Sequence, residues 1–109
     1  MSEYGPLVVF KSIPDFWTIE RNGNKPNTVC LLTPREYSER LDFANACMEA
    51  GEPATICMVN AKTVEPFFRA ITSIEQIGTI LGQTMWVISW RHEDGDGTYV
   101  DPFEEADHE

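Results

Sequence analysis

The sequence has no long hydrophobic run, no basic leader and no closely spaced cysteines. No apolar stretch approaches the roughly 18 residues of a membrane-spanning helix, and residues 1–11 lack the basic region that precedes the apolar part of a secretory signal. Cys30, Cys47 and Cys57 each lie among apolar residues, without the CxxC spacing of a zinc or redox motif. We therefore expect a cytoplasmic protein with buried, reduced thiols and no membrane association.

Signatures of several well-known chemistries are also missing. There is no Gly-rich phosphate loop, no GxSxG nucleophile turn and no HExxH zinc motif. Residues 94–98 hint at a calcium loop, but the position that must be glycine is Tyr99. His92 and His108 lie in an acidic stretch without other ligand-like neighbours. We therefore predict no metal and no cofactor.

Basic residues are absent from the end of the chain. Residues 92–109 carry eight acidic side chains and no Lys or Arg, whereas residues 1–91 carry ten acids against all eight bases. The formal net charge of −10 therefore belongs mostly to this end, and the rest of the chain is nearly neutral. We expect one domain over residues 1–91 and an acidic, flexible tail over residues 92–109.

The sequence does contain enough apolar residues for one folded domain. Hydrophobic residues make up 42% of the 109 residues, which suffices for a single core. Helical spacing and end signals, among them a capping box that starts at Thr33, predict two helices, at residues 14–22 and 34–50. β-branched and aromatic runs bounded by turn residues predict strands at residues 6–11, 28–32, 54–59, 63–72 and 84–90.

Three features refine this order. The third and fourth strands are expected to form a hairpin, and Pro66 would place the fourth strand at an edge of the sheet or at a bulge. The last strand should lie at the centre of the sheet, with Trp86, Ile88 and Trp90 on one face. Residues 73–82 are ambiguous, because their apolar residues have helical spacing while two glycines would make any helix short.

A loop at residues 22–28 joins the first helix to the second strand. Gly23 can take a positive φ, and Pro26 biases Lys25 toward an extended conformation. The loop therefore presents a cation, Lys25, and a hydroxyl, Thr28, three positions apart. The alternative is that the loop is only a connection, with a solvated lysine and a threonine that simply starts a strand.

This loop and two later segments resemble the ASCH branch of the PUA-like β-barrels, and also short phage and prophage proteins of that type. The matching segments read KPNTVC at residues 25–30, TVEPFFRAI at residues 63–71 and VISW at residues 87–90. The resemblance covers about residues 6–91 and implies an α+β fold: a small barrel of about five to six strands with two helices. It also implies a concave face near Lys25.

The resemblance implies a possible site as well. Relatives are suspected binders of RNA or nucleotides, and one enzymatic subgroup hydrolyses the acetyl amide of a modified cytidine with a Lys, a Thr and a Glu. Lys25 and Thr28 match the first two positions, and Glu65 is the best-placed acid, with Glu75 as the alternative. The family's Arg, two residues after the Thr, is Cys30 here, which removes an anion-binding fork.

The acidic tail suggests a different function. A tail with negative charge and aromatic anchors can occupy a basic, nucleic-acid-binding groove on another protein. We therefore expect a non-enzymatic phage or mobile-element protein that engages a host protein or nucleic-acid machine, as an inhibitor of host defence of the anti-CRISPR, nucleic-acid-mimicking kind would. The alternative is a nucleoside- or RNA-binding ASCH module with hydrolase potential. The tail residues that would make the contact are Asp94, Asp96, Tyr99, Asp101, Phe103, Glu104 and Glu105.

Overall fold

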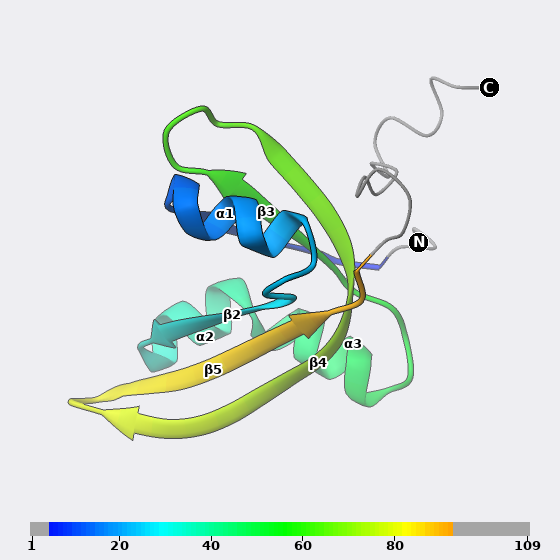
Figure 1. The fold of residues 1–109 in the computed structure, drawn as a ribbon. Helices are drawn as coiled ribbons and strands as arrows, with labels where there is room; N and C mark the ends of the chain where they lie inside the picture. The colour runs from blue at the N-terminus through cyan, green and yellow to red at the C-terminus, as the bar shows by residue number, and fades with distance from the viewer. Residues whose placement is uncertain (1–4, 93–109) are drawn as a thin grey trace.

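A computed structural model describes residues 5–92, which form an α+β fold of three helices and one five-stranded mixed sheet (Figure 1). The predicted order of strands and helices is confirmed, with one helix more than expected. The elements are β1 (Leu7–Ser12), α1 (Pro14–Arg21), β2 (Asn27–Leu32), α2 (Pro34–Arg40), α3 (Asp42–Glu49), β3 (Thr55–Asn60), β4 (Pro66–Ile80) and β5 (Gln83–Trp90).

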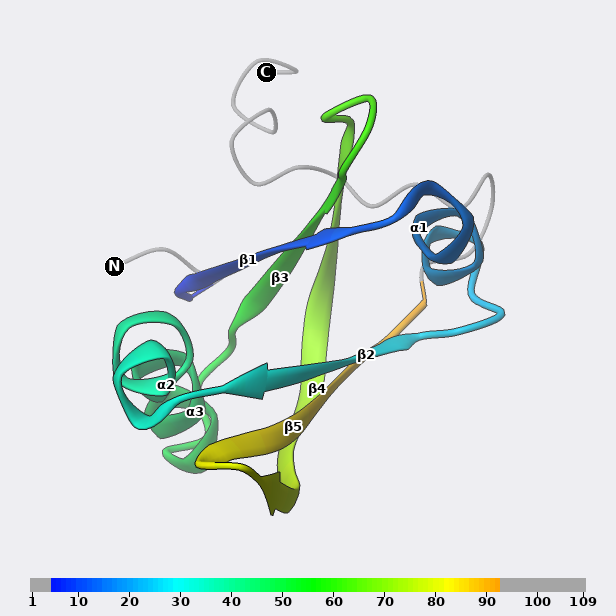
Figure 2. The same cartoon turned by 90° about the vertical axis from the view of Figure 1, so that its left-hand side faces the viewer.

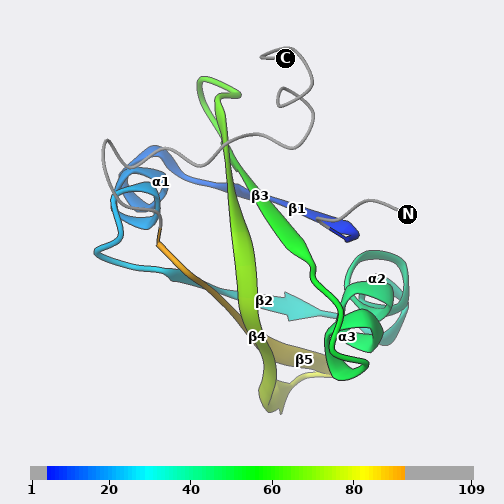
Figure 3. The ribbon, with the colours of Figure 1, turned by 90° about the vertical axis from the view of Figure 1, so that its right-hand side faces the viewer.

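The sheet is open. Its strand order is β1-β3-β4-β5-β2, in which β1 pairs with β3 in parallel and the other neighbours are antiparallel. The sheet curls so that its two edge strands, β1 and β2, lie on the same side (Figure 2). Helix α1 lies at one end of this curl, and α2 and α3 lie at the other (Figure 3). The closed barrel that the family resemblance implies is therefore not what residues 5–92 form.

Strand β4 differs most from expectation. It runs without interruption through residues 73–80, because these residues pair with β5 and two register shifts absorb the irregular spacing. A turn at Leu81 and Gly82, both with positive φ, then leads into β5. The edge position that Pro66 suggested is wrong: β4 is the central strand, and Pro66 is its first residue, where a missing N–H is tolerated.

The long helix predicted at residues 34–50 is two helices. The predicted capping box is present at Thr33 and Glu36, and α2 ends at Arg40. Leu41 then leaves helical geometry, with φ −129°, and its side chain is completely buried in the core. A single straight helix would keep the apolar side chains in line, whereas the bend lets α2 and α3 each face the sheet.

The core lies between the concave face of the sheet and the helices. Trp86, Ile88 and Trp90 are buried on one face of β5, as predicted, although β5 is next to the central strand. The Tyr37 ring of α2 stacks on Trp86, with 4.6 Å between ring centroids. Across residues 5–92, no helix combines the length and the apolar character needed to cross a membrane.

Candidate functional site

A cleft of about 360 Å³ opens where β1 ends and β2 begins, beside α1. Both edge strands contribute residues to it, and Figure 2 shows these two strands on the open side of the curled sheet. Its wall combines two cations, one buried acid, two hydroxyls and three apolar side chains. The lining residues are Lys11, Ser12, Ile13, Phe16, Glu20, Lys25, Thr28 and Val29.

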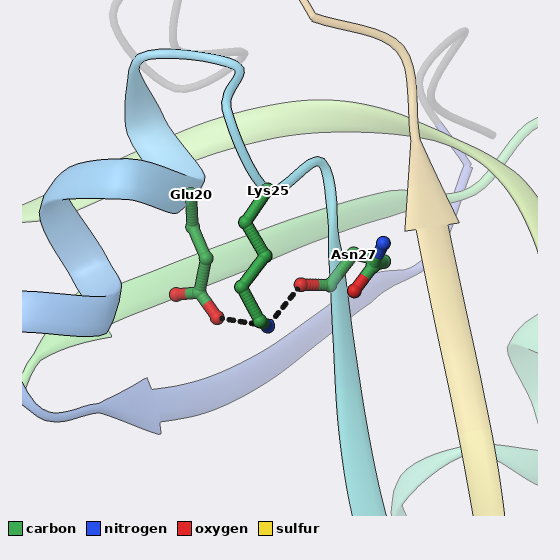
Figure 4. A network of polar contacts seen from close by, with 3 residues as sticks. All are labelled: Glu20, Lys25 and Asn27. Carbon is green, nitrogen blue, oxygen red and sulfur yellow. Dashed lines mark hydrogen bonds and ion pairs between the residues drawn. The ribbon is translucent and has the colours of Figure 1, made fainter.

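Lys25 is held at the wall of the cleft by two contacts (Figure 4). Its Nζ donates to Glu20 Oε2 at 3.2 Å and to the backbone oxygen of Asn27 at 2.8 Å. An ammonium group has three N–H donors, so these contacts leave one for a ligand. The Phe16 ring centroid lies 5.8 Å from the same Nζ, within the range of a cation–π contact.

Glu20 is the residue that the sequence prediction missed. Its side chain is 1% exposed and its Oε2 accepts from Lys25, but its buried Oε1 has no hydrogen-bond partner within the described part of the chain. Leaving a buried carboxylate oxygen unpaired is unfavourable by about 1–3 kcal/mol or more. Glu20 lies three residues after the buried Trp17, and this helical spacing was the one signal in the sequence that it faces inward.

The loop after α1 folds back on the helix that supplies Glu20. The Lys25 backbone N donates to Ile19 O at 2.9 Å, and Gly23 allows the turn with φ +91°. The end of β5 closes the loop from the other side, because Trp90 N donates to Pro26 O at 3.0 Å. The cation of the loop is thereby brought against the last turn of α1.

Arg69 of β4 binds the last turn of α1. This side chain is fully buried, and its Nη2 donates to Arg21 O at 2.9 Å while its Nη1 donates to Phe68 O at 2.8 Å. A cation at the carboxyl end of a helix is favoured by the helix dipole. The arginine of the predicted TVEPFFRAI segment thus fixes the helix that presents Glu20.

The predicted site residues are only partly brought together. Lys25 and Thr28 both line the cleft, as expected, whereas Glu65 is not among the lining residues. Glu65 is exposed in the connection between β3 and β4, and its backbone bonds to Asn60 and Thr63. The alternative acid, Glu75, is exposed on β4 and is likewise not part of the lining. The acid that contacts Lys25 is Glu20.

The remaining predictions concern thiols, metals and the tail. Cys47 and Cys57 are buried, and Cys30 is partly buried, with its pKa raised to about 11 by burial, an effect that the Arg40 charge partly opposes. Among residues 5–92, no three His, Cys, Asp or Glu side chains gather as metal ligands. The tail residues predicted to bind a partner, from Asp94 to Glu105, lie outside the described residues.

No protein-family model, curated protein or solved structure matches this chain. Two of the segments that carry the ASCH resemblance nevertheless lie side by side: residues 25–30 enter β2, and residues 87–90 end β5, its antiparallel neighbour. The third, at residues 63–71, supplies Arg69 beneath α1.

Proposed function

We propose that the cleft binds a nucleoside or an unpaired RNA base, and that the open sheet is a variant of the PUA/ASCH-like barrel. One observation carries the proposal: Glu20 is buried at the cleft with one carboxylate oxygen held by Lys25 and the other unpartnered among residues 5–92. Oε1 is itself buried, so a ligand N–H would reach it once the Glu20 carboxylate turns toward the cleft, and this hydrogen bond would satisfy the oxygen.

The other side chains of the cleft suit a planar, polar ring. Lys25 offers one N–H to a ring carbonyl or nitrogen, and the Thr28 hydroxyl can donate or accept. Phe16 is 50% exposed and provides an aromatic face on which a base can stack. A volume of about 360 Å³ is at the small end of ligand pockets.

The charges favour recognition of a base over recognition of a phosphate backbone. Residues 5–92 carry nine acids and eight bases, and the tail adds further negative charge. Binding to a phosphate chain depends on a basic stripe, which this balance does not supply. The position of the family's Arg is occupied by Cys30, and the loss of this anion-binding group also disfavours recognition of a phosphate.

Binding is better supported than hydrolysis. A catalytic Lys25 would have to accept a proton, but its ion pair with Glu20 uses the protonated amine. The expected third member, Glu65, is also not in the cleft. The amidohydrolase of modified cytidine remains the alternative, and release of acetate from acetylcytidine, abolished by Lys25→Ala, would establish it.

The test is a calorimetric or NMR titration with the four ribonucleosides. At least one should bind with chemical-shift changes at Lys25 and Thr28, and Glu20→Gln should weaken binding about tenfold or more, because it removes a charged acceptor. Glu75→Gln, an exposed acid outside the cleft, is the matched control and should bind as the native chain does. Equal affinity of Glu20→Gln and the native chain would refute the proposal.

A second candidate is the tail-led inhibitor of a host nucleic-acid machine, with a phage or mobile element as its source. It is favoured by the charge distribution, eight acids and no base over residues 92–109. Neutralising the tail acids should then abolish capture of a basic host protein, while Glu20→Gln should leave capture unchanged. The opposite pattern would favour the cleft as the functional surface.

A further inference from the structure

We propose that residues 93–109 of the same chain occupy the cleft and compete with its ligand. The inference depends on the proposed function only for its effect on ligand binding, since the contact between tail and cleft can be measured without any ligand. Three observations support it: where the tail begins, how far it reaches, and what the cleft offers it.

The tail begins beside the loop that carries Lys25. The His92 ring packs on Gly23, so closely that a Cβ added to Gly23 would lie 2.7 Å from His92 Cγ. Two residues earlier, Trp90 N donates to Pro26 O at 3.0 Å. The chain is therefore fixed at the loop just before the acidic residues start, and Glu93 follows directly.

The tail is long enough to reach every part of the cleft. Seventeen residues follow His92, which span up to about 55 Å when extended. For a flexible chain, Tyr99 would lie on average about 15 Å from His92. A short tether of this kind keeps a segment at an effective concentration in the millimolar range, so even a weak contact is well populated.

The cleft matches the composition of the tail. Ile13, Phe16 and Val29 line it and are 55%, 50% and 52% exposed, which leaves an apolar rim next to the cations Lys11 and Lys25. The tail combines acids with three larger apolar residues. These apolar residues are Tyr99, Val100 and Phe103.

The exposed apolar surface at the β4–β5 turn lacks this match. Ile77, Ile80 and Leu81 are 54%, 47% and 97% exposed around the β4–β5 turn. Residues 76–85 contain no charged side chain at all, so this surface offers an acidic segment nothing that balances its charge. The cleft therefore offers partners for both the charge and the aromatic rings of the tail, which this turn does not.

Zero-length carbodiimide crosslinking of the full chain tests the contact directly. We expect Lys25 and Lys11 to crosslink to Glu93, Asp94 or Asp96 within one molecule, and the yield to fall at high salt. Lys62, which is exposed but does not line the cleft, is the comparison lysine. Crosslinks that favour Lys62, or that form equally with all three lysines, would overturn the proposal.

NMR spectra of full-length variants provide the second measurement. Tyr99→Ser with Phe103→Ser should shift the amide signals of Ile13, Phe16 and Val29, because the rings leave the rim. The signals of Leu81 and Ile77 at the distant turn are the controls and should not move. Unchanged signals at the rim, or equal changes at both places, would contradict tail docking.

The effect on ligand binding separates this inference from the proposed function. With tail acids neutralised (Glu93→Gln, Asp94→Asn and Asp96→Asn), nucleoside affinity should rise about two- to tenfold, as expected when a competitor at millimolar effective concentration is removed. If crosslinks and shifts are seen but no nucleoside binds, the tail contact stands and the proposed function fails. If a nucleoside binds with the same affinity in both chains, the competition fails and the proposed function stands.

Discussion

The two ends of the curled sheet are covered by helices in different ways. At the α1 end, polar contacts accompany an apolar one: Glu20 holds Lys25 and Arg69 holds the last turn of the helix, while the buried Trp17 ring packs edge-on against Phe67. At the α2 end, they are mainly apolar: Tyr37 stacks on Trp86, and Leu41 is completely buried. The α1 end therefore buries charged groups in addition to aromatic surface, whereas the α2 end buries mainly apolar surface.

The difference between the two ends lies in the buried charges. Burying an ion pair adds little net stability, because desolvation offsets the attraction, while burying a large aromatic side chain contributes several kcal/mol. The α1 end buries a carboxylate oxygen that has no hydrogen-bond partner among residues 5–92, at some loss of stability.

The largest expected effect is at the α2 end. Trp86→Ala should lower the free energy of unfolding by about 3–5 kcal/mol, because it removes a buried ring and leaves a cavity. Trp86→Phe is the control and should lose much less, since an aromatic ring remains on Tyr37. Phe16→Ala at the α1 end, where the ring is half exposed, should lose under about 1 kcal/mol. Similar losses for Trp86→Ala and Phe16→Ala in urea unfolding would break the comparison.

Replacing one or the other partner of the ion pair at the α1 end should have unequal effects on stability. Lys25→Met should lower the free energy of unfolding by about 2–3 kcal/mol, because it leaves the buried Glu20 carboxylate without its cation. Glu20→Gln removes the buried charge instead, and leaves Lys25, which is 31% exposed, to water. Its effect should stay within about 1 kcal/mol. Equal losses in both variants, measured by chemical unfolding, would show that the pair is not buried as described.

The stability at alkaline pH tests whether water is excluded from the concave face beside the α2 end, where Cys30 lies opposite Trp86. Burial raises the pKa of Cys30 from 9.0 to about 11, so the unfolded chain loses this proton at lower pH than the folded chain. The contribution of the neutral thiol to the free energy of unfolding is therefore fully present below pH 9. It is lost as the pH rises from 9 to 11, which lowers the free energy of unfolding by about 1–2 kcal/mol. Cys30→Ser should lack this part of the pH dependence.

The raised pKa of Cys30 should also lower the reactivity of its thiol. At pH 8, the Cys30 thiolate should be about a hundredfold scarcer than that of an unperturbed thiol. Alkylation by iodoacetamide, located by mass spectrometry, should be slow at this site to the same degree in the folded chain. Rapid alkylation at pH 8 would show that water reaches Cys30 freely.

The smallest expected effects concern the starts of the two helices. Thr33 caps α2 through its side chain, whereas Ile13 caps α1 with no side-chain hydrogen bond. Thr33→Ala should lower the free energy of unfolding by about 1 kcal/mol, and Ile13→Ser should raise it by about 0.5 kcal/mol. Changes of opposite sign in the free energy of unfolding, measured by thermal unfolding, would confirm that α2 already has a favourable cap and α1 does not.

Much of the fold could be predicted because local signals agree with the tertiary structure. The strands that begin near residues 6, 28, 54 and 84 are β-rich runs between turn residues, and the start of α2 carries its capping box. The bend at Leu41 could not be predicted, since the apolar helical spacing continues through it. The second half of β4 was ambiguous because its spacing also suits a helix, and pairing with β5 decides the outcome.

The candidate site could be predicted only where local sequence determines it. Gly23 and Pro26 indicate a loop that presents Lys25 and Thr28, and both line the cleft. Glu20 was not predicted, because a buried acid runs against the hydrophobic pattern of α1. Its burial depends on Lys25, which reaches it only after the loop folds back, and on tertiary contacts that no short segment encodes.

The strand order also determines when the chain can fold. Strand β1 has to wait for β3, whose partner residues lie about fifty positions later in the sequence, and β2 has to wait for β5 at the end of the described chain. The first half of the protein thus contains two strands that cannot pair with each other. During synthesis, β2 can join the sheet only once residues near 90 have left the ribosome, and folding should be slow for a chain of this size.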